Sequence, residues 1–220
     1  MHSRDGKTSE FSSAAALWLV FLVFTVLVKV MDVRALGPQG SNIGFAAVNV
    51  LFFKLVGTHS FFYGLTQLIG YLSLLICAGF GVYGLMQLIR GKSIKAVDRK
   101  ILVLGAFYIA TILCYFFFEV LVINCRPILV DNLLEASYPS SHTMLTICVA
   151  LSTAYMAQFF TGKLKPYRKA IINGCYIVMV VAVIGRMLCG YHWLTDIIGG
   201  ALLATALYST FLAAQKKFAK

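Results

Sequence analysis

Long apolar runs alternate with short polar segments along this chain. Six such runs, each bounded by charged residues, Gly or Pro, cover residues 14–31, 68–89, 101–123, 143–160, 170–184 and 193–214. Crossing the hydrocarbon core of a bilayer takes about 20 apolar residues, and a segment in hydrocarbon must satisfy its own backbone hydrogen bonds, as a helix does. The pattern therefore predicts an all-α fold: a polytopic membrane protein with a bundle of six transmembrane helices, forming a single domain over residues 1–220.

A seventh apolar run, from Ile43 to Val56, is too short to cross a bilayer and is interrupted by Asn49 and Lys54. It follows the helix-breaking segment 37–40, which contains two Gly and one Pro. We expect this run to form an interfacial or re-entrant helix between the first two spans.

The first span follows Arg4 and Lys7, as the apolar core of a secretory signal would. That core is usually about 7–15 residues long and is followed by a small-residue cleavage site. The run here is longer and lacks a convincing site, so we expect an uncleaved anchor.

Composition and charge support a membrane setting. The 220 residues are 60% hydrophobic and only 12% charged, with a mean hydropathy of +0.85, which is too apolar for an ordinary water-soluble surface. The net charge of +11 would suit nucleic acid, but most of the basic residues gather in alternate connections, which argues against that partner. They are Arg4 and Lys7; Arg90, Lys92, Lys95, Arg99 and Lys100; Lys163, Lys165, Arg168 and Lys169; and Lys216, Lys217 and Lys220. Because basic residues favour cytoplasmic loops, we expect both termini in the cytoplasm and the intervening loops outside.

The first long outer loop holds Arg126 and ends with Ser140, Ser141 and His142, directly before the fourth span. Ser is a favoured N-cap residue, and the free amides of a first helical turn, together with the helix dipole, attract anions. This helix start is therefore a candidate phosphate site.

The second outer loop holds Arg186, His192 and Asp196. If a helix begins near His192, Asp196 lies one turn away on the same face. A carboxylate that accepts the Nδ1–H of a histidine leaves its Nε2 free to attack or to take a proton. His142 would serve as a general acid, and the arginines would clamp phosphoryl oxygens.

These residues resemble the type 2 phosphatidic acid phosphatase superfamily, whose membrane members hydrolyse lipid phosphates and diphosphates without metal. Its motifs are usually written KxxxxxxRP, PSGH and SRxxxxxHxxxD. The matching residues are Arg126 and Pro127; Pro139, Ser140, Ser141 and His142; and Arg186, His192 and Asp196. The order of the motifs and the six-span layout agree as well, so the resemblance covers nearly the whole chain.

The resemblance implies a role for each of these residues. His192 would be the nucleophile that forms a phosphohistidine, Asp196 would orient it, and His142 would protonate the leaving group. The phosphate would be held by Arg126, Arg186, Ser140 and the backbone around Ser141. No metal and no cofactor is implied.

The sequence departs from the family pattern at three positions. Ser141 replaces a glycine, Gly185 replaces a serine, and Glu119 stands where the family has lysine. A carboxylate beside a phosphate site repels the phosphate unless it is neutralised or paired with an arginine. Glu119 is therefore a possible modulator that points elsewhere, pairs with Arg126 or shifts substrate preference.

The expected function is hydrolysis of a lipid phosphate or diphosphate on the extracytoplasmic face of a bacterial plasma membrane. Undecaprenyl diphosphate, phosphatidic acid and phosphatidylglycerophosphate are the candidate substrates, and membrane lipids are the expected partners. Two alternatives stay open: a lipid phosphotransferase using the same phosphohistidine, and a non-catalytic phospholipid binder or translocator. The sequence also leaves open whether Cys125 and Cys189, near the proposed site, form a disulfide.

Overall fold

Helices account for almost all of the regular structure in the computed structural model, which describes residues 2–219 and, among them, the side chains from residue 11 onward. Within this part the α-helices are α1 (His2–Val30), α2 (Ala46–Val56), α3 (Ser60–Gly91), α4 (Arg99–Leu121), α5 (Ser141–Ala157), α6 (Arg168–Cys189) and α7 (Leu194–Phe218). Short 3₁₀ helices occupy Pro38–Gly40, Ile94–Ala96 and Gly162–Tyr167. The described chain has isolated bridges but no strand, which confirms the all-α prediction. The side chains of Arg4, Lys7 and Lys220, expected at the inner face, lie outside the described part.

Five helical segments are long and apolar enough to cross a membrane: Phe11–Val30, Ser60–Gly91, Arg99–Leu121, Gly162–Cys189 and Leu194–Phe218. They support an integral membrane protein. The predicted span 143–160 instead forms α5, whose 17 residues extend only about 25 Å, less than a hydrocarbon core of about 30 Å. The six-span count is therefore not confirmed.

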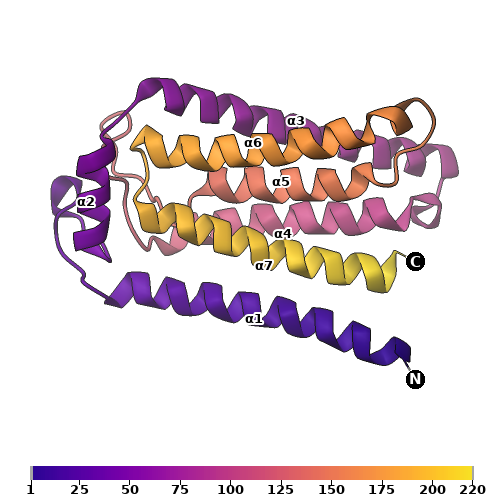
Figure 1. The fold of residues 1–220 in the computed structure, drawn as a ribbon, viewed down its shortest axis with the longest axis horizontal. Coiled ribbons are helices and arrows are strands. Elements are labelled where there is room, and N and C mark those ends of the chain that lie inside the picture. Colours follow the sequence, from indigo (N-terminus) through magenta and orange to yellow (C-terminus); the bar gives the residue numbers. More distant parts are fainter. Residues whose placement is uncertain (1, 220) are drawn as a thin grey trace.

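The long helices lie side by side, and α2 crosses one end of the bundle (Figure 1). Helix α1 packs along α7, while α5 contacts α3, α6 and α7. Most residues of α5 are buried, and a core of apolar side chains that includes Phe21, Leu104, Phe107 and Phe211 joins the helices. Helix α5 is thus enclosed by the longer helices, which carry most of the exposed apolar side chains.

Asn49 explains how α2 is fixed to the bundle. Asn49 is fully buried, and its side-chain nitrogen Nδ2 donates to the Gly44 carbonyl at 2.7 Å and to the Thr195 hydroxyl at 2.9 Å. Its side-chain oxygen accepts the Thr195 amide at 3.1 Å. The polar residue that interrupts the apolar run is therefore an anchor to the start of α7. An interfacial position for α2 stays a prediction.

Both ends of the chain lie at the end of the bundle opposite α2 (Figure 1). The connections from α3 to α4 and from α5 to α6, which carry the clustered basic residues, lie at this same end. The α4–α5 and α6–α7 connections lie at the other end, as the alternation of charge predicts. The side of the membrane that each end faces stays a prediction.

Candidate active site

Two loops from opposite halves of the sequence meet at the α2 end of the bundle: residues 122–140 between α4 and α5, and 190–193 between α6 and α7. The Ser140 amide donates to the Asp196 carbonyl at 2.9 Å. The buried Tyr138 hydroxyl pairs with Thr25 of α1 at 2.7 Å. Glycines make the approach possible, since a Cβ on Gly199 would collide with the Tyr138 ring and one on Gly200 would lie 2.7 Å from the Ser140 carbonyl oxygen.

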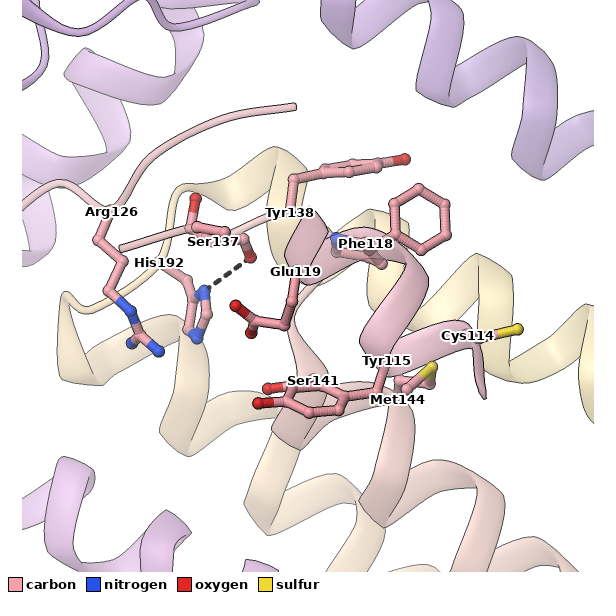
Figure 2. A pocket seen from close by; sticks show the side chains of 12 residues that line it. Cys114, Tyr115, Phe118, Glu119, Arg126, Ser137, Tyr138, Ser141, Met144 and His192 are labelled. Carbon is pink, nitrogen blue, oxygen red and sulfur yellow. Dashed lines mark hydrogen bonds between the residues drawn. The ribbon is translucent and has the colours of Figure 1, made fainter. Parts of the chain in front are cut away.

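His192 is 2% exposed and points one ring nitrogen into the pocket shown in Figure 2. Its Nδ1 lies 3.2 Å from the carbonyl oxygen of Ser137. Because a carbonyl can only accept, Nδ1 carries the proton and Nε2 keeps its lone pair. Nε2 is buried and has no hydrogen-bond partner within the described structure.

The surroundings of His192 favour the neutral imidazole. Burial, followed by the positive charges of Arg126 and Arg186, lowers its pKa well below the usual value. A neutral ring with a free Nε2 is the form of histidine that attacks phosphorus.

Asp196 does not orient His192 by a hydrogen bond, contrary to the sequence-based expectation. Its Oδ2 lies 3.9 Å from His192 Nδ1, which is too long for such a bond. The carboxylate instead accepts the Trp193 amide at 2.9 Å and the Asn124 side-chain amide at 3.3 Å. The reason is local: α7 begins at Leu194, so Asp196 occupies its first turn, where backbone amides need acceptors.

The two arginines differ in their pairing. Arg186 is 1% exposed; its Nη2 donates to Gln67 at 2.9 Å, whereas its Nε and Nη1 have no partner in the described structure. Arg126 Nε lies 2.9 Å from Glu135 Oε2, an ion pair by distance, although this Nε makes no well-aligned hydrogen bond. Buried guanidinium nitrogens without acceptors are costly, so Arg186 is suited to an anion that supplies the missing oxygens.

The start of α5 brings His142 to the same site. His142 is half-buried, and burial, followed by the electrostatic effects of Arg186, His192 and Arg126, lowers its pKa to about 3. A role as general acid therefore requires the negative charge of a bound phosphate, which favours the protonated imidazole. Gly70 of α3 makes room for its ring, because a Cβ there would lie 2.9 Å from His142 Cδ2.

Ser140 is the N-cap of α5, as predicted, and its side chain is an acceptor in this role. Its buried Oγ accepts the Thr143 amide at 3.4 Å and the Thr143 hydroxyl at 3.0 Å. In both contacts Oγ is the acceptor, so its own O–H proton stays available to a phosphate oxygen, and a role of Ser140 in phosphate binding stays a prediction. The backbone amides of Ser141 and His142, which precede the first intrahelical hydrogen bond, are further donors for an anion, and Ser141 lines the pocket.

Glu119 reaches from α4 into the pocket toward His192 (Figure 2). It does not pair with Arg126, which forms its ion pair with Glu135, and it lies one turn after Tyr115 on α4. Tyr115, Ser141 and Met144 line both this pocket and a neighbouring one.

The neighbouring pocket is a mainly apolar groove of about 380 Å³ between α3, α4 and α5. His142 lies on its wall. The residues that complete the lining are Gln67, Gly70, Tyr71, Leu74, Thr111, Ile112 and Leu145. An apolar chain can therefore run from the polar pocket along α4 past His142.

Three polar residues near the site did not stand out in the sequence. Asn124, 2% exposed, donates to Asp196 and accepts the Gly44 amide at 3.2 Å. Ser137 holds His192 through its carbonyl, which no side-chain pattern reveals, and Gln67 binds Arg186. The predicted span began at residue 68, so Gln67 stood just outside it; the structure places Gln67 inside α3, where a polar side chain needs a partner.

The cysteines and possible metal ligands need only brief mention. The disulfide left open by the sequence is not formed, since Cys125 and Cys189 are both free. Cys189 instead donates its thiol to the Arg186 carbonyl at 3.2 Å. Among the described residues no three His, Cys, Asp or Glu side chains are grouped closely enough to hold a metal ion.

Comparison with known proteins shows which family this chain resembles. The PAP2 superfamily model matches residues 6–220. Lipid phosphate phosphatase delta of Arabidopsis thaliana is 28% identical over 93 residues, which cover 40% of this chain and 21% of the plant protein. The match thus spans only about a fifth of that relative's length.

A solved structure extends the likeness to the whole fold. The crystal structure of a transmembrane PAP2-type phosphatidylglycerolphosphate phosphatase from Bacillus subtilis superposes with a TM-score of 0.61, covering 93% of this chain and 96% of that one at 19% identity. At this identity the likeness shows a shared fold. Because the family model covers nearly every residue and the sequence-based resemblance agrees with it, the chain belongs to the PAP2 superfamily.

Proposed function

We propose that this protein is a membrane lipid phosphatase that hydrolyses a phosphate monoester or diphosphate through a phosphohistidine on His192. One observation carries the proposal: the buried Nε2 of His192 has no partner in the described structure, and neither do Nε and Nη1 of the buried Arg186, whose charge acts on His192. Buried polar atoms without hydrogen-bond partners are rare in native proteins, and they are typical of a site that binds a ligand. A phosphoryl group supplies the acceptor oxygens for Arg186 and the electrophile for His192.

The first step is attack of His192 Nε2 on phosphorus. The N–P bond forms as the bond to the leaving oxygen breaks, and His142 donates a proton to that oxygen. Arg186 and the amides at the start of α5 stabilise the charge on the equatorial oxygens. Asp196, at 3.9 Å, offsets the positive charge that His192 gains.

The second step returns the enzyme to its starting state. His142, now neutral, takes a proton from a water molecule whose oxygen attacks phosphorus. The N–P bond breaks, inorganic phosphate leaves, and the proton taken from water restores the acidic His142. In this scheme the cationic charge comes from the arginines, so activity does not require an added divalent ion.

The apolar groove supports a lipid as substrate. His142 lies on the groove wall while His192 lines the polar pocket, so the leaving group extends from the reacting phosphate into the groove. The phosphates of undecaprenyl diphosphate, phosphatidic acid and phosphatidylglycerophosphate all have an apolar tail of this kind. We place the site on the extracytoplasmic face because the clustered basic residues lie at the opposite end of the bundle.

The test is phosphate release by the purified protein in detergent, with EDTA and without added metal, from each of these three lipids. Wild type is compared with His192→Ala and with His59→Ala, which removes an exposed histidine that lies outside the pocket. We expect release from wild type and His59→Ala and none from His192→Ala. An acid-labile phosphate on the wild-type chain that His192→Ala lacks would identify the intermediate.

A folded wild type that releases no phosphate from any lipid would contradict the proposal. Transfer of the phosphoryl group to an added lipid alcohol in preference to water would replace the hydrolase by a phosphotransferase. Saturable binding of a lipid phosphate with no turnover would support the non-catalytic lipid binder instead.

A further inference from the structure

Buried and exposed parts of the site carry charges of opposite sign. The buried part of the site, called the floor here, contains Arg186, which is 1% exposed, does not itself line the polar pocket and forms no ion pair with any described acidic residue. Its mouth holds two carboxylates and one guanidinium: Arg126 is paired with Glu135, and no described Lys, Arg or His forms an ion pair with the exposed Glu119. The floor is therefore positive, and the mouth carries one uncompensated negative charge.

Glu119 lies where the leaving group of a lipid phosphate has to pass. Tyr115, one turn earlier on α4, borders both the polar pocket and the apolar groove, while Glu119 borders the polar pocket only. Figure 2 shows the Glu119 carboxylate between His192 and the hydroxyl groups of Tyr115 and Ser141. A substrate whose phosphorus meets His192 and whose chain lies in the groove places its first carbon atoms beside Glu119.

A carboxylate at this point discriminates between substrates by charge. It repels the dianionic phosphate of a purely anionic lipid, and it attracts a cationic group attached close to the phosphate ester. The buried unpartnered Nε2 of His192, aimed into the same pocket, and the unpaired donors of Arg186 bind the phosphate end of such a molecule. The arrangement is thus complementary to a zwitterion: phosphate at the floor, cation at the mouth, apolar chain in the groove.

We propose that Glu119 selects lipid phosphates whose leaving alcohol carries an ammonium group next to the phosphate ester. This inference rests on the proposed phosphatase activity and names a substrate class for it.

The experiment uses two substrates that differ only in charge: a long-chain 2-amino-1-alkanol phosphate and its N-acetyl derivative. The measured quantity is the ratio of their kcat/KM values for the full chain in detergent. We expect wild type to prefer the amine by about tenfold and Glu119→Gln to bring the ratio close to one by slowing the amine substrate. Glu119→Lys should reverse the preference and raise activity toward phosphatidic acid.

A matched control is Glu135→Gln, which also removes one carboxylate from the mouth. Because Glu135 is held by Arg126, its loss frees a guanidinium and should change both substrates in the same direction. The ratio should therefore respond to Glu119→Gln and far less to Glu135→Gln. Equal kcat/KM values for the two substrates in wild type, or a ratio that Glu119→Gln leaves unchanged, would overturn the inference. Phosphate release in the same assay would still support the proposed phosphatase activity.

A binding readout separates the two proposals further. Dissociation constants of both ligands are measured on His192→Ala, with and without Glu119→Gln. If the amine binds more tightly and this difference depends on Glu119, the result supports the inference even when wild type shows no turnover. Absence of turnover would contradict only the proposed phosphatase activity. Equal binding of the two ligands would remove the inference by itself.

Discussion

A backbone carbonyl, rather than a carboxylate, fixes the reactive form of His192. The Ser137 oxygen accepts the Nδ1 proton at 3.2 Å, so the tautomer depends on the course of the α4–α5 loop. Asp196 is drawn to the start of its own helix and acts on the imidazole through space at 3.9 Å. The sequence suggested that one His192–Asp196 hydrogen bond both sets the tautomer and stabilises the imidazolium. In the structure Ser137 sets the tautomer, and Asp196 contributes only its charge.

Replacing Asp196 should separate its helix-capping role from its charge. Asp196→Ala removes the acceptor of the Trp193 amide and the partner of Asn124, and we expect the free energy of unfolding to fall by about 1–3 kcal/mol. Asp196→Asn keeps an acceptor oxygen and should stay within about 1 kcal/mol of wild type. Denaturation in detergent measures both, and equal losses in the two variants would assign the effect to charge instead of capping.

The pH dependence of activity should reflect the environment of His192. Burial and the nearby arginines lower its pKa, so the neutral, attacking form persists below the ordinary value of about 6.5, and the acid limb of activity lies where pH falls through the lowered pKa. The alkaline limb belongs to His142, which must be protonated to act as the general acid. Arg126→Gln removes one positive charge, which raises that pKa and should move the acid limb of kcat/KM to higher pH. Arg34→Gln, which alters an exposed ion pair outside the pocket, should leave the acid limb in place; an unmoved limb in Arg126→Gln would contradict this account.

At the scale of elements, α2 holds the helix that carries the active site. The sequence presents Asn49 as a break in an apolar run, and only the fold shows that Asn49 satisfies the first turn of α7. Side-chain amides buried between helices cannot be matched to partners from one sequence, because the partner here lies 146 positions away. A short helix is thereby a structural part of the site.

Asn49→Ala should therefore weaken a helix distant in sequence. It leaves the Thr195 amide and the Gly44 carbonyl buried without these partners, and we expect a loss of about 1–3 kcal/mol in unfolding free energy together with lower kcat. Leu51→Ala in the same helix removes a side chain that is 60% exposed and serves as the control. Equal stability of the two variants would show that α2 does not support α7.

The spacing between α3 and α5 should set the position of the general acid. Gly70→Ala places a methyl group 2.9 Å from the His142 ring, and because misplacement of a catalytic group by about 1 Å can cost about 100-fold in rate, we expect a large fall in kcat with the fold retained. Gly64→Ala is the matched control, since nothing lies within 4 Å of a Cβ at that position of the same helix. Similar kcat values for both variants would argue against a role for His142 at this position.

For the whole molecule, periodicity and motif order predicted much of the arrangement. Apolar length located the helices, and the alternation of basic loops agrees with the two ends of the bundle in Figure 1. The spacing of His192, Arg186 and His142 indicated one site because each residue stands beside a helix end, where loops from different spans can meet. What stayed hidden depends on tertiary contacts: the Ser137 carbonyl, the pairing of Arg126 with Glu135, and the shortness of α5, which ends at Ala157 although two further apolar residues, Phe159 and Phe160, follow Gln158.

The orientation of the bundle in the membrane is the remaining consequence of its charge, and it can be measured directly. In a background without the native cysteines, Leu133→Cys marks the site end and Lys163→Cys marks the basic end, and both positions are exposed. Because basic loops stay in the cytoplasm, a membrane-impermeant maleimide added to intact cells should label Leu133→Cys and should reach Lys163→Cys only after permeabilisation. The reverse pattern would place the site in the cytoplasm, where its lipid would have to come from the inner leaflet. Labelling of both positions in intact cells would mean that the chain inserts in two orientations, and that the basic connections do not determine its topology.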